Sequence, residues 1–227
     1  MSTPTPNWAT TRHFLYVADP LCSWCYGFAP VISAITKHFD DRLPLRLVMG
    51  GLRAGNTRPM RDDDKAYIRN AWTKVGGTTG RPFDTAFFDR DGFIYDTEPV
   101  CRAVVTVREW PEQAPVSPLT LKDRLSSAFY AHNRDVTDPS VLADIAAEAG
   151  FDRQAFFDRL QSPDMRNLTF RDFLTSQQMG VEGFPMLAAG TEQGGYALIT
   201  HGYRPIDGLI EGVESWLANG APVTAAN

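Results

Sequence analysis

The chain of 227 residues has few cysteines, no long apolar run and no excess of basic residues. Three cysteines are far fewer than a small disulfide-stabilised fold contains, so disulfides are not expected to hold this chain together. No stretch approaches the roughly 18 apolar residues of a membrane-spanning helix, and no membrane partner is expected. The net charge of −5 offers no general surface for phosphate groups, so nucleic acid is not an expected partner either.

The N-terminal segment also lacks the features of a secretory signal. Its first seven residues carry neither a basic start nor an apolar segment, and the first strongly apolar run, residues 14–18, is short. A cytoplasmic location is therefore predicted. In a reducing compartment, a close pair of cysteines is more often catalytic, redox-sensing or metal-binding than structural.

Hydrophobic periodicity divides the chain into three parts. The first part predicts a strand over His13–Ala18, a helix from Ser23 to about His38 and a strand over Leu43–Met49. The second part predicts helices over Asp62–Val75, Pro99–Trp110, Thr120–Asn133, Pro139–Ala149, Asp152–Gln161 and Asp164–Met179. The third part predicts strands over Phe184–Ala189 and Tyr196–His201, then a helix over Pro205–Ala218. The predicted order is β-α-β, a block of helices, then β-β-α.

Cys22 and Cys25 stand where the first strand gives way to the first helix. At a helix start, free backbone N–H groups and the positive end of the helix dipole favour the thiolate of the first cysteine. Cys25 lies one turn further on, where it is more shielded and can resolve a mixed disulfide formed at Cys22. Trp24 lies between them and can offer an apolar surface to a polypeptide. This placement predicts thiol–disulfide exchange.

Two other interpretations of the pair stay open on these residues alone. Both thiols could simply be small buried hydrophobes. They could also be half of a zinc site, but the remaining ligands would have to come from Cys101 and four scattered histidines, so no metal is predicted. Cys101 itself lies on a predicted apolar helix face and is expected to be a buried core thiol, with a second redox role as the alternative.

Three further positions are candidates for the site. Asp19 is predicted to be a turn residue ahead of Pro20, with proton transfer during exchange as the alternative. The glycine-rich segment 50–60 carries Arg53 and Arg58, which could bind an anionic group such as a glutathione carboxylate or could be solvated loop residues. Pro185 precedes a predicted strand, and an X–Pro bond is the common route to a cis peptide, although trans is the commoner state.

The chain resembles the DsbA family of thioredoxin-fold proteins in three segments: Asp19-Pro20-Leu21-Cys22-Ser23-Trp24-Cys25-Tyr26-Gly27-Phe28, Gly50-Gly51-Leu52-Arg53 and Gly183-Phe184-Pro185. These segments are most similar to the FrnE-like branch, often described as predicted protein disulfide isomerases. The resemblance implies an α/β thioredoxin fold split by a large all-helical insertion domain. It assigns residues 1–55 and 180–227 to a discontinuous thioredoxin-like domain and residues 56–179 to the helical domain.

By matching positions, the resemblance also implies roles for individual residues. Cys22 becomes the nucleophile, Cys25 the resolving thiol and Pro185 a cis-proline beside them. Trp24, Phe184 and Pro185 are expected to bind substrate. The missing signal peptide departs from secreted members of the family and argues against a periplasmic oxidase.

The predicted function is a thiol–disulfide oxidoreductase or isomerase that acts on protein or small-molecule disulfides. No bound cofactor is expected, although glutathione could serve as a co-substrate. One alternative is a glutathione-dependent enzyme of the kappa-class transferase or 2-hydroxychromene-2-carboxylate isomerase type, which typically has serine where Cys22 stands here. Another is a polypeptide-binding chaperone with silent thiols. The apolar faces of the helical insert could also support a homodimer.

Overall fold

The computed structural model describes residues 6–219 of the chain. Residues 1–5 and 220–227, which belong to the predicted thioredoxin-like domain, lie outside the described residues, as does most of the segment from which a cytoplasmic location is predicted. None of the helices in the described range is long and apolar enough to cross a membrane.

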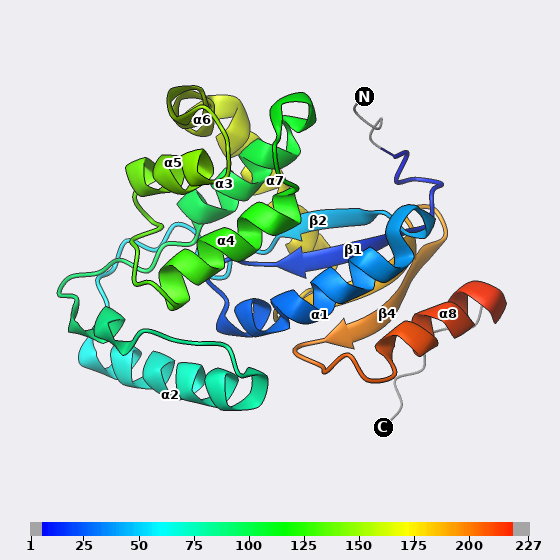
Figure 1. Cartoon of the computed structure of the whole chain (residues 1–227), viewed down its shortest axis with the longest axis horizontal. Coiled ribbons are helices and arrows are strands. Elements are labelled where there is room, and N and C mark those ends of the chain that lie inside the picture. The colour runs from blue at the N-terminus through cyan, green and yellow to red at the C-terminus, as the bar shows by residue number, and fades with distance from the viewer. Residues whose placement is uncertain (1–5, 220–227) are drawn as a thin grey trace.

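A four-stranded mixed sheet organises the fold, with its strands in the order β2-β1-β3-β4 (Figure 1). The central strand β1 (His13–Ala18) runs parallel to β2 (Leu45–Met49) and antiparallel to β3 (Met186–Thr191). The last strand, β4 (Gly195–His201), forms an antiparallel hairpin with β3. All six residues of β1 are buried, which agrees with its apolar sequence and its central position.

The helices follow the predicted order. Helix α1 (Ser23–Phe39) connects β1 to β2, and α8 (Leu209–Asn219) follows β4. Between β2 and β3 lie α2 (Asp62–Thr79), α3 (Glu98–Arg108), α4 (Pro118–Tyr130), α5 (Pro139–Glu148), α6 (Arg153–Leu160) and α7 (Pro163–Gln178). In Figure 1, α3, α5 and α6 gather beyond the β2 edge of the sheet, α8 lies near β4, and α4 lies alongside α1.

Side chains on the two faces of the sheet enter different hydrophobic clusters, because successive residues of a strand point to opposite faces. Phe14 and Tyr16 pack with buried residues of α1 and α8 in the main cluster, whereas Leu15 and Val17 belong to a smaller one. The main cluster continues into α3, α4, α5 and α6. The helices inserted between β2 and β3 therefore share one continuous core with the sheet.

The end of α2 differs from the prediction. The two glycines at positions 76 and 77 were expected to end the helix at Val75, but α2 continues to Thr79 and ends at Gly80, which has a φ of 71°. Tertiary packing explains the difference, because Val75 and Thr79 contact Gly27 of α1 so closely that a Cβ there would lie 2.8 Å from Thr79. This contact outweighs the low helix propensity of the glycines.

Several other boundaries differ by two to four residues, and the starts of β3 and α8 have clear physical reasons. Strand β3 begins at Met186 instead of Phe184, since Pro185 has no N–H to donate to a ladder. Helix α8 begins at Leu209 instead of Pro205, after a turn in which the Leu209 N–H donates to the Ile206 carbonyl at 3.0 Å. Gly208 lies in that turn with a φ of 75°, a conformation that favours glycine.

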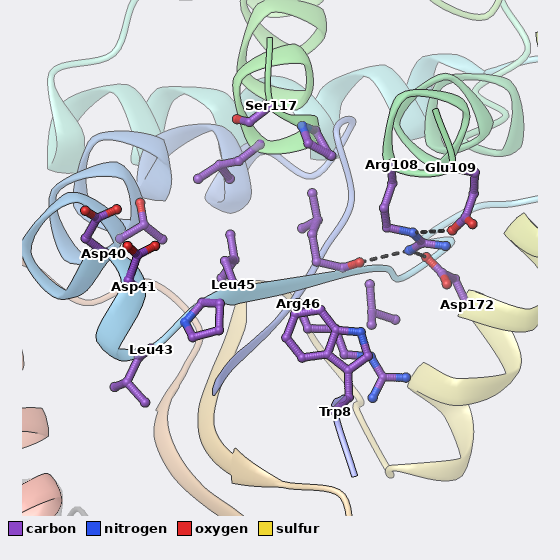
Figure 2. A pocket seen from close by; sticks show the side chains of 16 residues that line it. Trp8, Asp40, Asp41, Leu43, Leu45, Arg46, Arg108, Glu109, Ser117 and Asp172 are labelled. Carbon is purple, nitrogen blue, oxygen red and sulfur yellow. Dashed lines mark hydrogen bonds and ion pairs between the residues drawn. The ribbon is translucent and has the colours of Figure 1, made fainter. Parts of the chain in front are cut away.

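A side-chain pair covers part of the outer edge of β2. Nη1 of Arg108 donates to the Leu47 carbonyl at 2.9 Å and to Oδ2 of Asp172 at 2.6 Å. The same Asp172 oxygen accepts the Met49 backbone N–H at 2.9 Å. Figure 2 shows the Arg108 guanidinium held between Glu109 and Asp172. These contacts satisfy backbone groups that an edge strand otherwise presents to other chains.

Replacing Asp172 by Ala should lower the free energy of unfolding by about 3 kcal/mol, because it leaves the Met49 N–H without an acceptor and removes one of the two carboxylates that accompany the Arg108 charge. Chemical denaturation measures the change. The matched control is Glu148→Ala, which removes an ion pair with Arg134 whose Glu148 side chain is 60% exposed. This control should cost less than about 1 kcal/mol. Equal losses in the two variants would contradict the role given to Asp172.

Candidate active site

The two close cysteines lie at the start of α1. Cys22 is the N-cap residue, with an extended backbone (φ −91°, ψ 116°), and its side chain makes no capping hydrogen bond. Its carbonyl accepts the Tyr26 N–H at 3.0 Å, which begins the helix, and its own N–H donates to the Asp19 carbonyl at 3.1 Å. Cys22 is 7% exposed and Cys25 is fully buried, and both are free thiols.

The environment separates the acidities of the two thiols. A hydrogen bond from the Cys25 thiol lowers the pKa of Cys22, helped by the Cys25 backbone N–H and the Lys122 charge, while burial and Asp19 oppose the shift. Burial raises the pKa of Cys25 well above the usual range, and its hydrogen bond to Cys22 adds to that shift. Cys22 is thus the thiol that ionises first, as a nucleophile must.

The segment at Gly50 and the segment at Phe184–Pro185, more than 130 residues apart in the chain, meet beside Cys22. Its Sγ donates to the Phe184 carbonyl at 3.6 Å, and the Phe184–Pro185 peptide bond is cis. Gly50 packs against the Phe184 ring so closely that a Cβ at this position would lie 2.2 Å from it. The three segments singled out in the sequence therefore converge at one place.

Asp19 connects the active-site segment to the segment that follows β2. Its carboxylate accepts the Leu21 N–H at 2.8 Å, which forms the predicted turn, and the Leu52 N–H at 2.7 Å. The Cys101 thiol donates to the same carboxylate at 3.5 Å. Cys101 is fully buried, as predicted for a core thiol. Burial raises the pKa of Asp19, although the two backbone hydrogen bonds oppose the shift.

Three side chains of the helical block hold carbonyl groups of the active-site segment. Ser126 donates to the Pro20 carbonyl at 2.7 Å, and the Tyr95 hydroxyl donates to the Leu21 carbonyl at 2.9 Å. Nζ of Lys122 donates to the Cys25 carbonyl at 2.9 Å. Sequence reasoning missed all three. The one available signal was that Lys122 and Ser126 are polar residues four apart beside the apolar positions of a predicted helix.

The other predicted site residues are placed less closely together. Trp24 is partly buried and packs against Tyr203, with ring centroids 5.6 Å apart. Arg53 lies over the Tyr95 ring, with its guanidinium carbon 5.0 Å from the centroid. Arg58 instead forms an ion pair with Asp64 at 3.2 Å. Of the two arginines proposed for an anionic group, only Arg53 thus lies against Tyr95, the residue whose hydroxyl donates to the Leu21 carbonyl beside Cys22.

A cavity of about 510 Å³ lies beside β2, lined by residues that include Trp8, Leu45, Arg46 and Asp172 (Figure 2). None of the candidate catalytic or substrate-binding residues lines it, so it is separate from the dithiol. Within residues 6–219, no three His, Cys, Asp or Glu side chains are grouped as a metal ion would require.

A family model described as the DSBA-like thioredoxin domain matches residues 96–211, about half of the chain. The chain belongs to this DsbA-like family. The matched range includes the helices from α3 to α7 and the Phe184–Pro185 segment, and it ends within α8.

Solved structures show that the DsbA-like fold extends over nearly the whole chain. A candidate protein disulfide isomerase from Nitrosomonas europaea is 34% identical, with a TM-score of 0.83, and the match covers 93% of this chain and 100% of the other. The cytosolic disulfide reductase DsbM from Pseudomonas aeruginosa is 23% identical, with a TM-score of 0.73, over 91% of this chain and 98% of the other. At this lower identity, the likeness to DsbM shows the shared fold.

Curated relatives carry a different name. The ClpXP adapter protein SpxH of Halalkalibacterium halodurans is 22% identical over 174 residues, and the protein of the same name from Bacillus subtilis is 22% identical over 170 residues. Both matches cover 74% of this DsbA-like chain and 55% of the relative. The chain thus spans about half the length of the curated relatives that it matches.

In the native protein, iodoacetamide should alkylate Cys22 and leave Cys25 and Cys101 unmodified. The thiolate is the reactive form, so the lowered pKa of Cys22 places half of its maximal rate below pH 9.0, the ordinary value. The pKa values of Cys25 and Cys101 are raised, which keeps both protonated there. Mass spectrometry of tryptic peptides across a pH series measures the rates, and the unfolded protein, in which all three should react, is the control. Faster modification of Cys25 than of Cys22 would reverse the assigned roles.

Proposed function

We propose that this DsbA-like protein is a thiol–disulfide oxidoreductase that exchanges disulfides with protein or small-molecule substrates through Cys22 and Cys25. The observation that carries the proposal is the placement of Cys22 at the N-cap of α1, with its Sγ 3.6 Å from the Phe184 carbonyl, and of Cys25 one turn further on. A lowered pKa gives Cys22 the thiolate that attacks, and a raised pKa keeps Cys25 protonated until it is needed.

In the reducing direction, the Cys22 thiolate attacks one sulfur of a substrate disulfide and releases the other sulfur as a thiolate. Cys25 then loses its proton and attacks Sγ of Cys22, which forms the Cys22–Cys25 disulfide and releases the second substrate thiolate. Two electrons pass from the dithiol to the substrate, and each released thiolate can take up a proton. Oxidation of a substrate dithiol is the reverse sequence. In isomerisation, a second substrate thiolate attacks the mixed disulfide, forms a new substrate disulfide and releases the Cys22 thiolate, with no net transfer of electrons.

An exposed apolar surface near the dithiol supports a polypeptide substrate. Phe170 and Leu174, four residues apart on α7, are 49% and 53% exposed, and Leu52, which follows Gly51 in the chain, is 45% exposed. Phe173 links them to the site, because its ring contacts both Phe170 and the backbone at Gly51. We name Leu52, Phe170 and Leu174 the α7 patch. Together with Trp24, Phe184 and Pro185, it offers an extended chain an apolar path to Cys22.

Glutathione is the small-molecule substrate that we propose. DsbM, a fold neighbour, is named a cytosolic disulfide reductase, and one of its solved structures is described as being with GSH. Here Arg53 lies beside Tyr95 and forms no ion pair with another residue of the range 6–219, so its guanidinium is available to a carboxylate. A cytoplasmic reductase or isomerase of FrnE-like type fits these features, because the glutathione pool there favours dithiols.

A second candidate function is binding of a protein partner without redox chemistry. The relatives named ClpXP adapter proteins and the α7 patch both favour it. The glutathione transferase and chromene isomerase alternative is favoured less, because Cys22 stands where those enzymes typically carry serine. Disulfide exchange and partner binding make opposite predictions for a variant that keeps the α7 patch and loses the thiols: the first function is lost and the second is retained.

Cys22→Ser should abolish reduction of insulin disulfides by glutathione, with a loss of at least about a hundredfold, because it removes the attacking thiolate. Cys25→Ser should instead accumulate a mixed disulfide at Cys22, visible by mass spectrometry, because no resolving thiol is present. Cys101→Ser is the control and should retain activity, since the Cys101 side chain is fully buried away from solvent. Insulin reduction that Cys22→Ser leaves undiminished would show that Cys22 does not carry the exchange, and absence of insulin reduction by the wild-type protein would leave partner binding as the function.

Replacing both Phe170 and Leu174 by Ser should raise the KM for a protein disulfide by at least about tenfold, because the exposed halves of two apolar side chains are no longer buried against the substrate. Turnover of oxidised glutathione should not change, since so small a substrate does not reach across the α7 patch. The control is Leu198→Ser, which alters a residue of β4 with the same 53% exposure as Leu174. A parallel loss on both substrates would show that the patch supports the site and does not bind protein.

A further inference from the structure

Lys122 on α4 is a buried lysine in an unusual position. Its side chain is fully buried, and its Nζ donates to the Cys25 carbonyl at 2.9 Å. Within the range 6–219, no carboxylate lies within ion-pair distance of it. Lys65 of α2 is a useful contrast, because it is only partly buried and donates to two carbonyls, at 3.0 and 2.7 Å.

A buried cation is costly unless an opposite charge accompanies it. The titratable groups that face the dithiol are Tyr16 of β1, Asp19 after β1, Tyr95 before α3, and Lys122 and Tyr130 of α4. Burial raises the pKa of each of the three tyrosines, so none of them carries charge near neutral pH. Asp19 is a negative neighbour, and it disfavours the Cys22 thiolate. Lys122 is the cation of this group.

We infer that Lys122 is a positioning residue whose buried charge stabilises the Cys22 thiolate and thereby shifts the equilibrium of the Cys22–Cys25 couple toward the dithiol. The inference rests on the proposed function, since it concerns the redox couple that function needs. In the reduced site, the Cys22 thiolate supplies a negative charge in the neighbourhood of the buried lysine.

The electron balance gives the direction of the effect. Reduction of the disulfide takes two electrons and one proton, and it yields the Cys22 thiolate and the Cys25 thiol. The disulfide carries no charge, so a nearby cation stabilises the reduced form and not the oxidised one. The couple becomes more oxidising than it would be without Lys122. The same charge lowers the pKa of Cys25, which assists its later attack on Cys22, although burial dominates there.

A purely structural role predicts a different result. Ser126 and Tyr95 hold carbonyl groups of the same segment without any charge, and Lys122 could do no more than that for Cys25. Lys122→Gln keeps a hydrogen-bond donor and removes the charge, whereas Lys122→Met removes both. If only the hydrogen bond matters, the Gln variant resembles the wild-type protein. If the charge matters, the Gln and Met variants change together.

The test is the redox equilibrium of the full chain in buffers of defined ratio of reduced to oxidised glutathione, followed by alkylation and mass spectrometry. Both variants should hold the disulfide at ratios where the wild-type protein is a dithiol. The equilibrium constant should shift by roughly tenfold, or about 30 mV for a two-electron couple. Thiolate absorbance at 240 nm should show the Cys22 midpoint moving to higher pH. Lys65→Met is the matched control and should change neither quantity.

Each result decides a different question. A wild-type equilibrium and an unshifted Cys22 midpoint in Lys122→Gln would overturn the inference and leave the proposed function standing. No measurable couple in the wild-type protein would instead remove the proposed function. Carbon NMR of the lysine Cε resonances in the reduced wild-type protein needs no variant, and a neutral Lys122 amine would also overturn the inference.

Discussion

The geometry of the site depends on hydrogen bonds from the helical block to the backbone of residues 20–25. Ser126, Tyr95 and Lys122 each donate to one carbonyl of this short segment. Those hydrogen bonds are buried, and a buried carbonyl without a donor is costly. Because the segment includes the N-cap of α1, these three bonds also set where the free N–H groups of the helix point, and so which sulfur they stabilise.

The inserted helices are therefore part of the site, and they do more than shield it. The main hydrophobic cluster runs without a break from the sheet into α3 and α4, so Lys122 and Ser126 of α4 and Tyr95 before α3 are positioned by the same core as the sheet. Burial at this junction has two consequences. It raises the pKa of Cys25, and it strengthens the influence of the few nearby charges, Asp19 and Lys122, on Cys22.

The sheet topology brings the three sequence motifs together. Strands β1 and β2 are parallel, so the residues that follow them, the Cys22 segment and Gly50, leave the sheet at the same end. Strand β3 is antiparallel to β1, with Met186 opposite Val17, so the Phe184–Pro185 segment enters the sheet at that end as well. In this mixed sheet, each of the three motifs adjoins a different strand, β1, β2 or β3. The motifs are therefore close in space although they are far apart in the chain.

Local patterns in the sequence determined the order of the strands and helices, the position of Cys22 and Cys25 at a strand–helix junction, and the turn at Asp19. Such features depend on residues a few positions apart, whose hydrogen bonds and faces repeat with the period of the strand or helix. The resemblance to DsbA proteins added the distant Phe184–Pro185 segment. The extent of α2 through its two glycines could not be read locally, because packing against α1 decides it.

Only the tertiary structure decided which charges and donors surround the dithiol. Lys122 and Cys25 are 97 positions apart, and nothing in the pattern around either residue indicates the other. Whether a lysine on a helix lies in solvent or under the active site depends on how that helix packs, and packing is a property of the whole core. The sequence by itself thus determined where the two close cysteines lie, whereas the fold determined the electrostatic environment that makes their thiols unequal.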